Sequence, residues 1–158
     1  MIRRWWRRRA ESSPRYDPGR ERRAERKARE LLRSIVSADE YEMYAELGFI
    51  SVEGGEQGSG YAYLLYPHRP IVAYAIAGGE LLNEYCVAFH DDSEPALGSR
   101  LPDADDVLAK WMSLRGGERN LIARANMHLP GRQLDPQQVR RDLRSLLIWR
   151  SARAGAGA

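Results

Sequence analysis

The sequence predicts a single α+β domain, in which an antiparallel meander of about four strands packs against N-terminal and C-terminal helices. Apolar residues recur at helical spacing in residues 20–36 and again in residues 136–150. Between these stretches, residues 49–89 contain short runs of strand-forming residues that are divided by Gly- and Pro-rich turns. The length of 158 residues suits one domain with tails and is short of two domains.

We expect three parts along the chain. Residues 1–16 are charge-dense and contain a Ser-Ser-Pro break, so they form a disordered arm. Residues 17–130 form the α+β domain, and residues 131–158 form a basic C-terminal helix with a flexible tail, AGAGA. The chain has no run of eighteen apolar residues and so predicts no membrane span. Cys86 is the only cysteine, which excludes an internal disulfide and favours a cytoplasmic location.

Two helices are expected at the start of the domain. Asp17 and Pro18 provide an N-cap acceptor followed by proline at the first helical position. The first helix then shows an apolar stripe, formed by Ala24, Ala28, Leu31, Leu32, Ile35 and Val36. Ser37 and Glu40 have the spacing of a capping box that opens a second helix, which Gly48 ends.

Four strands are expected at FISVE, YAYLLY, IVAYAIA and LLNEYCVAFH. Gly78-Gly79 predicts a two-residue hairpin that pairs Ala77 with Glu80, and the PHRP turn closes a second hairpin at Tyr66 and Ile71. These registers predict one large, aromatic sheet face, composed of Tyr61, Tyr63, Leu65, Val72, Tyr74, Ile76, Tyr85, Val87 and Phe89. The opposite face is smaller and Ala-rich, and either helices or a partner could cover it.

The last third of the chain predicts three helices. LPDADDVLAKWMSLR begins with aspartates that suit the helix dipole, and Gly116-Gly117 separates it from a short second helix, ERNLIARAN. Asp135-Pro136 repeats the N-cap and proline signal and opens the basic C-terminal helix.

The middle of the chain resembles a group of small bacterial and phage-encoded domains that have no established activity. The resemblance rests on KARELLRSIVSADEYEMYAELGFISV, EYCVAF and ADDVLAKWMSLRGGERNLIARAN, within residues 27–127. It implies this order of helices and strands and assigns no catalytic residue. The basic segments at the two ends lie outside it.

Charge is divided unevenly along the chain. Residues 1–33 carry thirteen Lys or Arg against five Asp or Glu, whereas residues 34–130 carry six against fifteen. Residues 131–158 are basic again, with six against two. Such a division of charge indicates what the protein could associate with and does not indicate its fold. One alternative is that the basic ends fold back on the acidic centre of the same or a neighbouring chain.

The sharpest candidate site is the arm MIRRWWRRR. Arginines can neutralise phosphates while indoles stack on exposed bases, and the same composition suits the headgroups of an anionic membrane. A tail without specific function and a protein partner remain alternatives. The candidate binding residues are Arg3, Arg4, Trp5, Trp6, Arg7, Arg8 and Arg9. A secondary basic surface is expected at Arg140, Arg141 and Arg144 of the C-terminal helix.

The sequence shows no convergent set of catalytic residues. Cys86 and His90 are separated by about 13 Å of strand, too far for a nucleophile and its base. His68, His90 and Asp91 could meet at one end of the sheet as metal ligands, but no ligand-spacing motif supports them. Asn83 is expected beside Tyr74, whose hydroxyl would satisfy the buried amide.

The sequence therefore predicts a non-enzymatic accessory protein without a cofactor or a metal. Its cationic arm would contact an anionic partner, and non-specific nucleic-acid binding is the leading interpretation. The alternatives are an assembly or adaptor protein with a protein partner, possibly phage-related, and a protein of the membrane surface.

Overall fold

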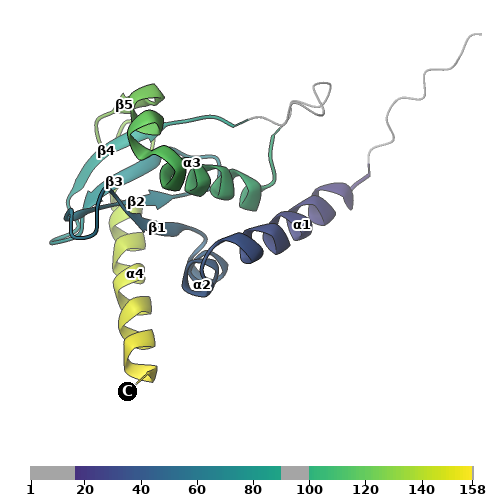
Figure 1. Cartoon of the computed structure of the whole chain (residues 1–158), viewed down its shortest axis with the longest axis horizontal. Coiled ribbons are helices and arrows are strands. Elements are labelled where there is room, and N and C mark those ends of the chain that lie inside the picture. Colours follow the sequence, from purple (N-terminus) through teal and green to yellow (C-terminus); the bar gives the residue numbers. More distant parts are fainter. Residues whose placement is uncertain (1–16, 90–99, 158) are drawn as a thin grey trace, which may run out of the picture.

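The computed structural model describes residues 17–89 and 100–157 and shows one α+β domain (Figure 1). The helices are α1 (Arg20–Ile35), α2 (Ala38–Leu47), α3 (Asp103–Arg124) and α4 (Pro136–Ala156). The strands are β1 (Ile50–Glu53), β2 (Tyr61–Leu65), β3 (Ile71–Ala75), β4 (Leu81–Cys86) and β5 (Asn126–His128). The strands form an antiparallel meander in the order β1-β2-β3-β4-β5.

Local signals set the helix ends at three places. Ser37 and Glu40 form the complete capping box of α2, and Gly48 ends that helix in the left-handed conformation with φ of 84°. The side chain of Asp135 accepts a hydrogen bond from the Gln137 backbone and starts α4, with Pro136 as its first residue. At α1 the expected start is two residues early, because Asp17 bonds the Gly19 backbone and the helix begins at Arg20.

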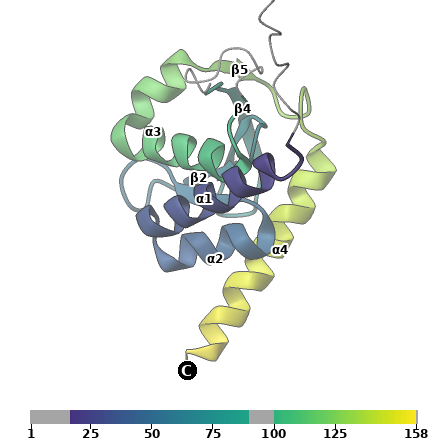
Figure 2. The ribbon, with the colours of Figure 1, turned by 90° about the vertical axis from the view of Figure 1, so that its right-hand side faces the viewer.

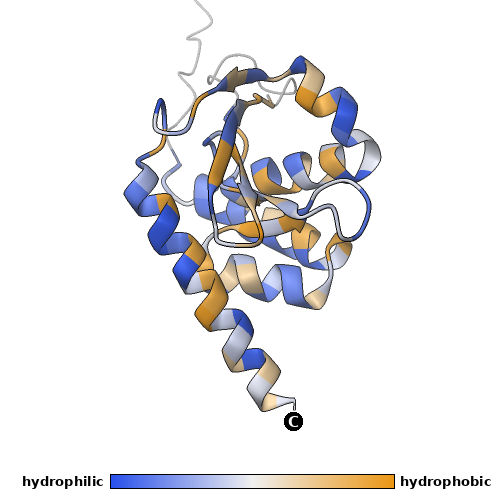
Figure 3. Ribbon diagram, turned by 90° about the vertical axis from the view of Figure 1, so that its left-hand side faces the viewer, coloured by the Kyte–Doolittle hydropathy of each residue, from blue (hydrophilic) through white to orange (hydrophobic). Residues whose placement is uncertain are grey.

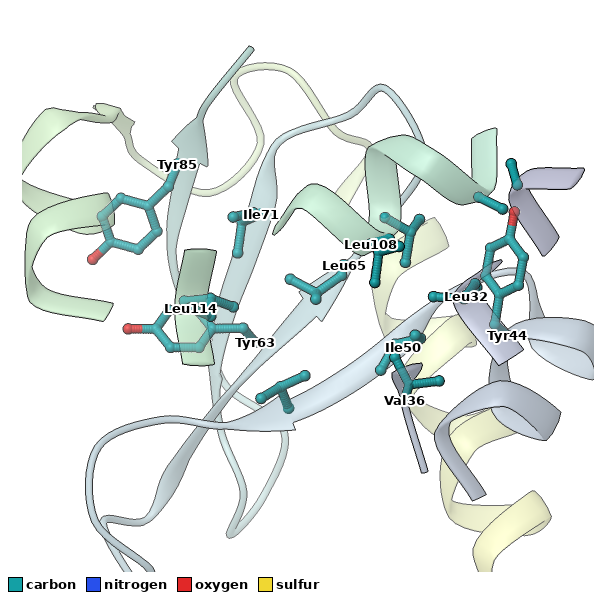
Figure 4. Close-up of a cluster of buried hydrophobic side chains, with 14 of the residues drawn as sticks. Leu32, Val36, Tyr44, Ile50, Tyr63, Leu65, Ile71, Tyr85, Leu108 and Leu114 are labelled. Carbon is teal, nitrogen blue, oxygen red and sulfur yellow. The ribbon is translucent and has the colours of Figure 1, made fainter. Parts of the chain in front are cut away.

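Helices α1 and α3 cover one face of the sheet (Figure 2). The core on this side contains Leu32 and Val36 of α1, Ile50 and Leu65 of the sheet, and Leu108 of α3 (Figure 4). Leu32, Ile50 and Leu65 have no exposed surface. This core holds the first two helices and the first half of α3 to the sheet.

Helix α4 covers the opposite face. Val139, Leu143 and Leu146 of α4 pack against Leu64 and Val72 of the sheet in a second hydrophobic core. Figure 3 shows that the middle of α4 is hydrophobic, between hydrophilic turns. The face of the sheet opposite α1 and α3 is thus covered by the chain's own C-terminal helix, and β2 and β3 are buried on both sides.

Two expected elements differ from the structure. The sheet has a fifth strand, β5, which pairs with β4 through Tyr85 and Met127. The expected tail is largely helical, since α4 continues through Ala156. The break expected at Gly116-Gly117 is confirmed, because α3 consists of two helical segments that meet at a kink where the Gly117 backbone leaves helical geometry.

The predicted register of β3 was wrong by one residue. Tyr63 lies opposite Ala73 instead of Tyr74, so Tyr74 and Val72 point to the α4 side. Because side chains alternate along a strand, a slip of one residue moves every side chain to the other face. The final hairpin also differs, because Ala75 pairs with Glu80 across a longer turn than Gly78-Gly79 alone.

Candidate functional site

Helix α1 carries four exposed arginines along one face. Arg22, Arg26, Arg29 and Arg33 follow one another at spacings of four, three and four residues, and we call them the arginine ridge. Such spacings place side chains in a single row on a helix, here over about 16 Å of its length. The ridge is separate from the face that α1 buries in the core, so it presents its guanidinium groups to solvent.

Helix α2 positions the second half of the arginine ridge. The guanidinium carbon of Arg29 lies 5.3 Å from the centre of the Tyr44 ring, and that of Arg33 lies 5.8 Å from the Tyr41 ring. Arg29 also donates a 3.0 Å hydrogen bond to Glu25. Partial burial alone would lower the pKa of Arg29, but this hydrogen bond leaves the pKa above its ordinary value, so the group stays charged.

The first half of the ridge differs from the second in its partners. Arg22 and Arg26 form no ion pair with any residue in the described ranges, 17–89 and 100–157. Arg23, on a different side of α1, is instead paired with Asp17. Arg22 and Arg26 also lie on the part of the ridge that comes first after the predicted arm in the sequence. The arm residues Arg3, Arg4, Trp5, Trp6, Arg7, Arg8 and Arg9 lie outside the described residues.

The arginines predicted to form a secondary basic surface lie on α4. Arg140, Arg141 and Arg144 are all exposed. Arg141 donates to the Gln138 side chain at 2.8 Å. Arg140 and Arg144 make no ion pair with other residues that the structure describes. Beside them on α4 lie two exposed apolar side chains, Leu147 and Ile148.

An acidic surface separates the arginine ridge from the α4 arginines. Helix α2 contacts both α1 and α4, and its acidic residues bind α4. Arg153 pairs with Asp39 at 2.8 Å and with Glu42, while the Trp149 indole donates to Glu46 at 2.8 Å. The basic C-terminal helix therefore folds back on the acidic centre of the same chain at this point, and the two basic surfaces are distinct.

His68 is held by α3. Its Nε2 lies 3.0 Å from Asp103, and its backbone N–H donates to Asp106 at 2.8 Å. The other two metal-ligand candidates, His90 and Asp91, lie outside the described residues. Within the residues that are described, no group of three histidine, cysteine or acidic side chains is arranged to hold a metal ion. The contacts of His68 with Asp103 and Asp106 connect the PHRP turn to the first turn of α3.

Lys110 is a buried residue that the sequence interpretation missed. Its ammonium group donates to the Asp106 carboxylate at 2.6 Å and to the carbonyls of Tyr66 and Arg69 at 2.6 and 2.9 Å. Burial lowers the pKa of Lys110, and the attraction of Asp106 opposes that change. All three ammonium protons are used, so Lys110 fixes the PHRP turn on α3. The spacing of four residues between Asp106 and Lys110 was the available signal.

Two polar residues of β4 also have structural partners. The Glu84 carboxylate is buried and accepts backbone hydrogen bonds from Gly131 and Gln133 at 3.1 Å each, which anchors the loop before α4. Asn83 does bond a tyrosine hydroxyl, but the partner is Tyr85 at 3.3 Å. The expected partner, Tyr74, lies on the opposite face because of the register of β3.

The part of the chain that the structure describes has no helix long and apolar enough to span a bilayer. No protein-family model, curated protein or solved structure matches the chain. The resemblance to small bacterial and phage-encoded domains therefore stays a prediction.

Proposed function

We propose that this protein is a cytoplasmic, non-enzymatic accessory protein that binds nucleic acid without reading its sequence. The N-terminal arm and the arginine ridge act together as one cationic element. The observation that supports this proposal is the single row of Arg22, Arg26, Arg29 and Arg33 that follows the arm in the sequence. Guanidinium groups about 5–6 Å apart along a helix can each meet a phosphate of a nucleic-acid backbone.

The tryptophans give the arm a second means of contact. Trp5 and Trp6 can stack on unpaired bases, which favours single strands over duplexes. The ridge meets only phosphates, so it contributes equally for any sequence. The proposal thus predicts binding that depends steeply on salt and little on sequence.

The test is a salt-dependent titration of labelled single- and double-stranded DNA and RNA with the full chain. The variant R22Q/R26Q/R33Q removes three ridge charges, and R140Q/R141Q/R144Q is its charge-matched control on α4. The ridge variant should lower the slope of log K against log salt by about 2.7 on duplex DNA, at about 0.9 per phosphate contact. The α4 variant should leave the slope nearly unchanged, because acidic α2 separates α4 from the ridge.

A chain lacking residues 1–16 and the variant W5A/W6A complete the test. The truncation should weaken binding to all nucleic acids, and the tryptophan variant should weaken binding to single strands most. Equal losses from the ridge and α4 variants would contradict the role of the ridge. Binding to anionic vesicles but to no nucleic acid would replace the proposal with a membrane-surface role.

The runner-up is an adaptor that binds another protein through α4. The face of the sheet opposite α1 and α3 is covered, but Leu147 and Ile148 are 62% and 72% exposed on α4, close in sequence to the exposed Arg144. A helix face with exposed aliphatic residues and arginines suits an acidic, apolar partner surface. An L147S/I148S variant that loses a co-purifying partner and keeps nucleic-acid binding would favour this alternative.

A further inference from the structure

A cleft of about 690 Å³ lies between the end of β4 and the second half of α3. Its lining comes from residues 86–89 at the end of β4, from α3 between Ser113 and Arg124, and from Asn126 of β5. Volumes of about 300–1,000 Å³ are usual for sites that bind small molecules. Neither the arginine ridge nor the α4 arginines line it, so the proposed nucleic-acid binding makes no use of this cleft.

The kink in α3 shapes the cleft. The backbone at Gly117 leaves helical geometry, and the helix continues beyond it in a new direction. The next residue, Glu118, is held by the hydroxyls of Tyr61 and Tyr63 at 2.8 and 2.7 Å. These hydrogen bonds fix the second half of α3 to the sheet, so the wall of the cleft is preformed.

The lining combines apolar and polar residues. Its apolar members include Val87 and Phe89, which follow β4, and Leu121 of α3. Arg124 and Asn120 of α3 belong to the polar lining. Neither of these two side chains has a hydrogen-bond or ionic partner among residues 17–89 and 100–157.

The charge of the cleft is opposite to that of the surrounding chain. Residues 34–130 carry fifteen acidic against six basic residues, yet none of the acidic residues that the structure describes lines the cleft. Among the described residues, Arg124 is the only charged member of the lining. A guanidinium in such surroundings favours an anion, and a carboxylate matches its planar pair of donors.

We propose that this cleft binds a small monocarboxylate with an apolar, aromatic or aliphatic body. The carboxylate pairs with Arg124, and Asn120 can donate a further hydrogen bond. The body of the ligand lies on Val87, Phe89 and Leu121, where it loses contact with water. Apolar contact supplies affinity, and the guanidinium selects the charge of the head group.

The experiment titrates 4-phenylbutyrate into the full chain by calorimetry and by ¹⁵N–¹H correlation spectra. Two compounds of the same body serve as matched probes, 4-phenylbutan-1-ol and 4-phenylbutylamine. R124Q removes the guanidinium, and R119Q is the control, because Arg119 is exposed on the same half of α3 and does not line the cleft. Both replaced side chains are exposed, so far-UV circular dichroism should show an unchanged fold.

We expect phenylbutyrate to bind with a Kd of about 1 mM or tighter, as a ligand of this size can. Resonances of residues 87–89 and 120–126 should shift, and R124Q should weaken binding about tenfold or more while R119Q stays within about twofold. The alcohol and the amine should bind at least about tenfold more weakly than the acid.

The proposal is overturned by any of three results. These are no binding of phenylbutyrate, equal binding by R124Q and the unaltered chain, or spectral shifts that map away from the cleft. Equal binding of the alcohol and the acid would likewise overturn the assignment of a carboxylate. The R22Q/R26Q/R33Q variant should bind phenylbutyrate normally, so failure of this proposal and failure of nucleic-acid binding can be told apart.

Discussion

Replacing Lys110 with methionine tests whether the buried pair with Asp106 fixes the turn between β2 and β3. Lys110 is 1% exposed and Asp106 is 3% exposed, so K110M leaves a carboxylate buried without its cation. It also removes the donor to the carbonyls of Tyr66 and Arg69. Breaking a buried ion pair from one side costs about 3–5 kcal/mol, which is a large part of the stability of a small domain.

The double variant D106N/K110M separates the charge from the shape of the site. With both charges gone, the isolated-carboxylate penalty disappears, so the double variant should be more stable than K110M by about 2 kcal/mol. The amide oxygen that D106N introduces can still accept the backbone hydrogen bond that His68 donates to the Asp106 carboxylate. The free energy of unfolding would be measured by urea denaturation monitored by circular dichroism.

If K110M lowers the free energy of unfolding by less than about 1 kcal/mol, the reasoning is refuted, because removing one partner of a buried ion pair should cost more than that. A double variant less stable than K110M would also refute it, because both variants lack the hydrogen bonds to Tyr66 and Arg69, and removing the unpaired carboxylate would then have brought no gain in stability. In K110M we also expect faster amide hydrogen exchange in the PHRP turn than in α4.

Three further predictions concern other parts of the fold. E84Q should cost about 1–3 kcal/mol, because an amide cannot accept all the backbone hydrogen bonds that the carboxylate does, and exchange should quicken first in the 129–135 loop. L146A should lose about 2–5 kcal/mol from the second core in urea denaturation, whereas L147A, its exposed neighbour, should change stability by about 0.5 kcal/mol or less. Above pH 10 stability should fall, because burial raises the pKa of three tyrosines and the unfolded chain releases phenol protons that the folded chain retains. These tyrosines are Tyr44, Tyr63 and Tyr66. The stabilisation from these three tyrosines is complete below the ordinary tyrosine pKa of 10.0 and is lost as the pH rises above it. Lys110, whose pKa is lowered by burial, acts in the opposite direction, but it is one group against three. A tyrosinate absorbance titration with the same midpoint in buffer and in urea would contradict this prediction.

Sequence signals that act over a few residues were sufficient for the helices. The capping box at Ser37 and Glu40, the left-handed Gly48 and the Asp135-Pro136 start were each readable, because cap and helix lie within four residues. The antiparallel order of the first four strands followed from alternation and turns. The candidate sites were readable only in part. The apolar stripe of α1 indicated which side the core would bury, but the contacts of Arg29 with Tyr44 and of Arg33 with Tyr41 depend on where α2 lies.

Tertiary contacts decided the rest. The register of β3 depends on the turn that Lys110 and Asp106 hold from α3, about forty residues away, and no local pattern contains that contact. β5 has only three residues, which are too few for a periodic signal, and it forms by pairing with the edge of β4.

By itself, the sequence determined the fold class, most helix ends and the division of charge between a basic N-terminus and an acidic centre. The tertiary structure decided that Arg29 and Arg33 of α1 lie over tyrosines of α2, that α4 covers the second face of the sheet, and that a cleft lined by Arg124 lies at the kink of α3. The physical reason is the distance in sequence over which each interaction acts. Helix capping, helix dipoles and apolar periodicity involve residues that are close together in the chain, whereas strand register, burial and clefts depend on contacts between residues far apart in sequence.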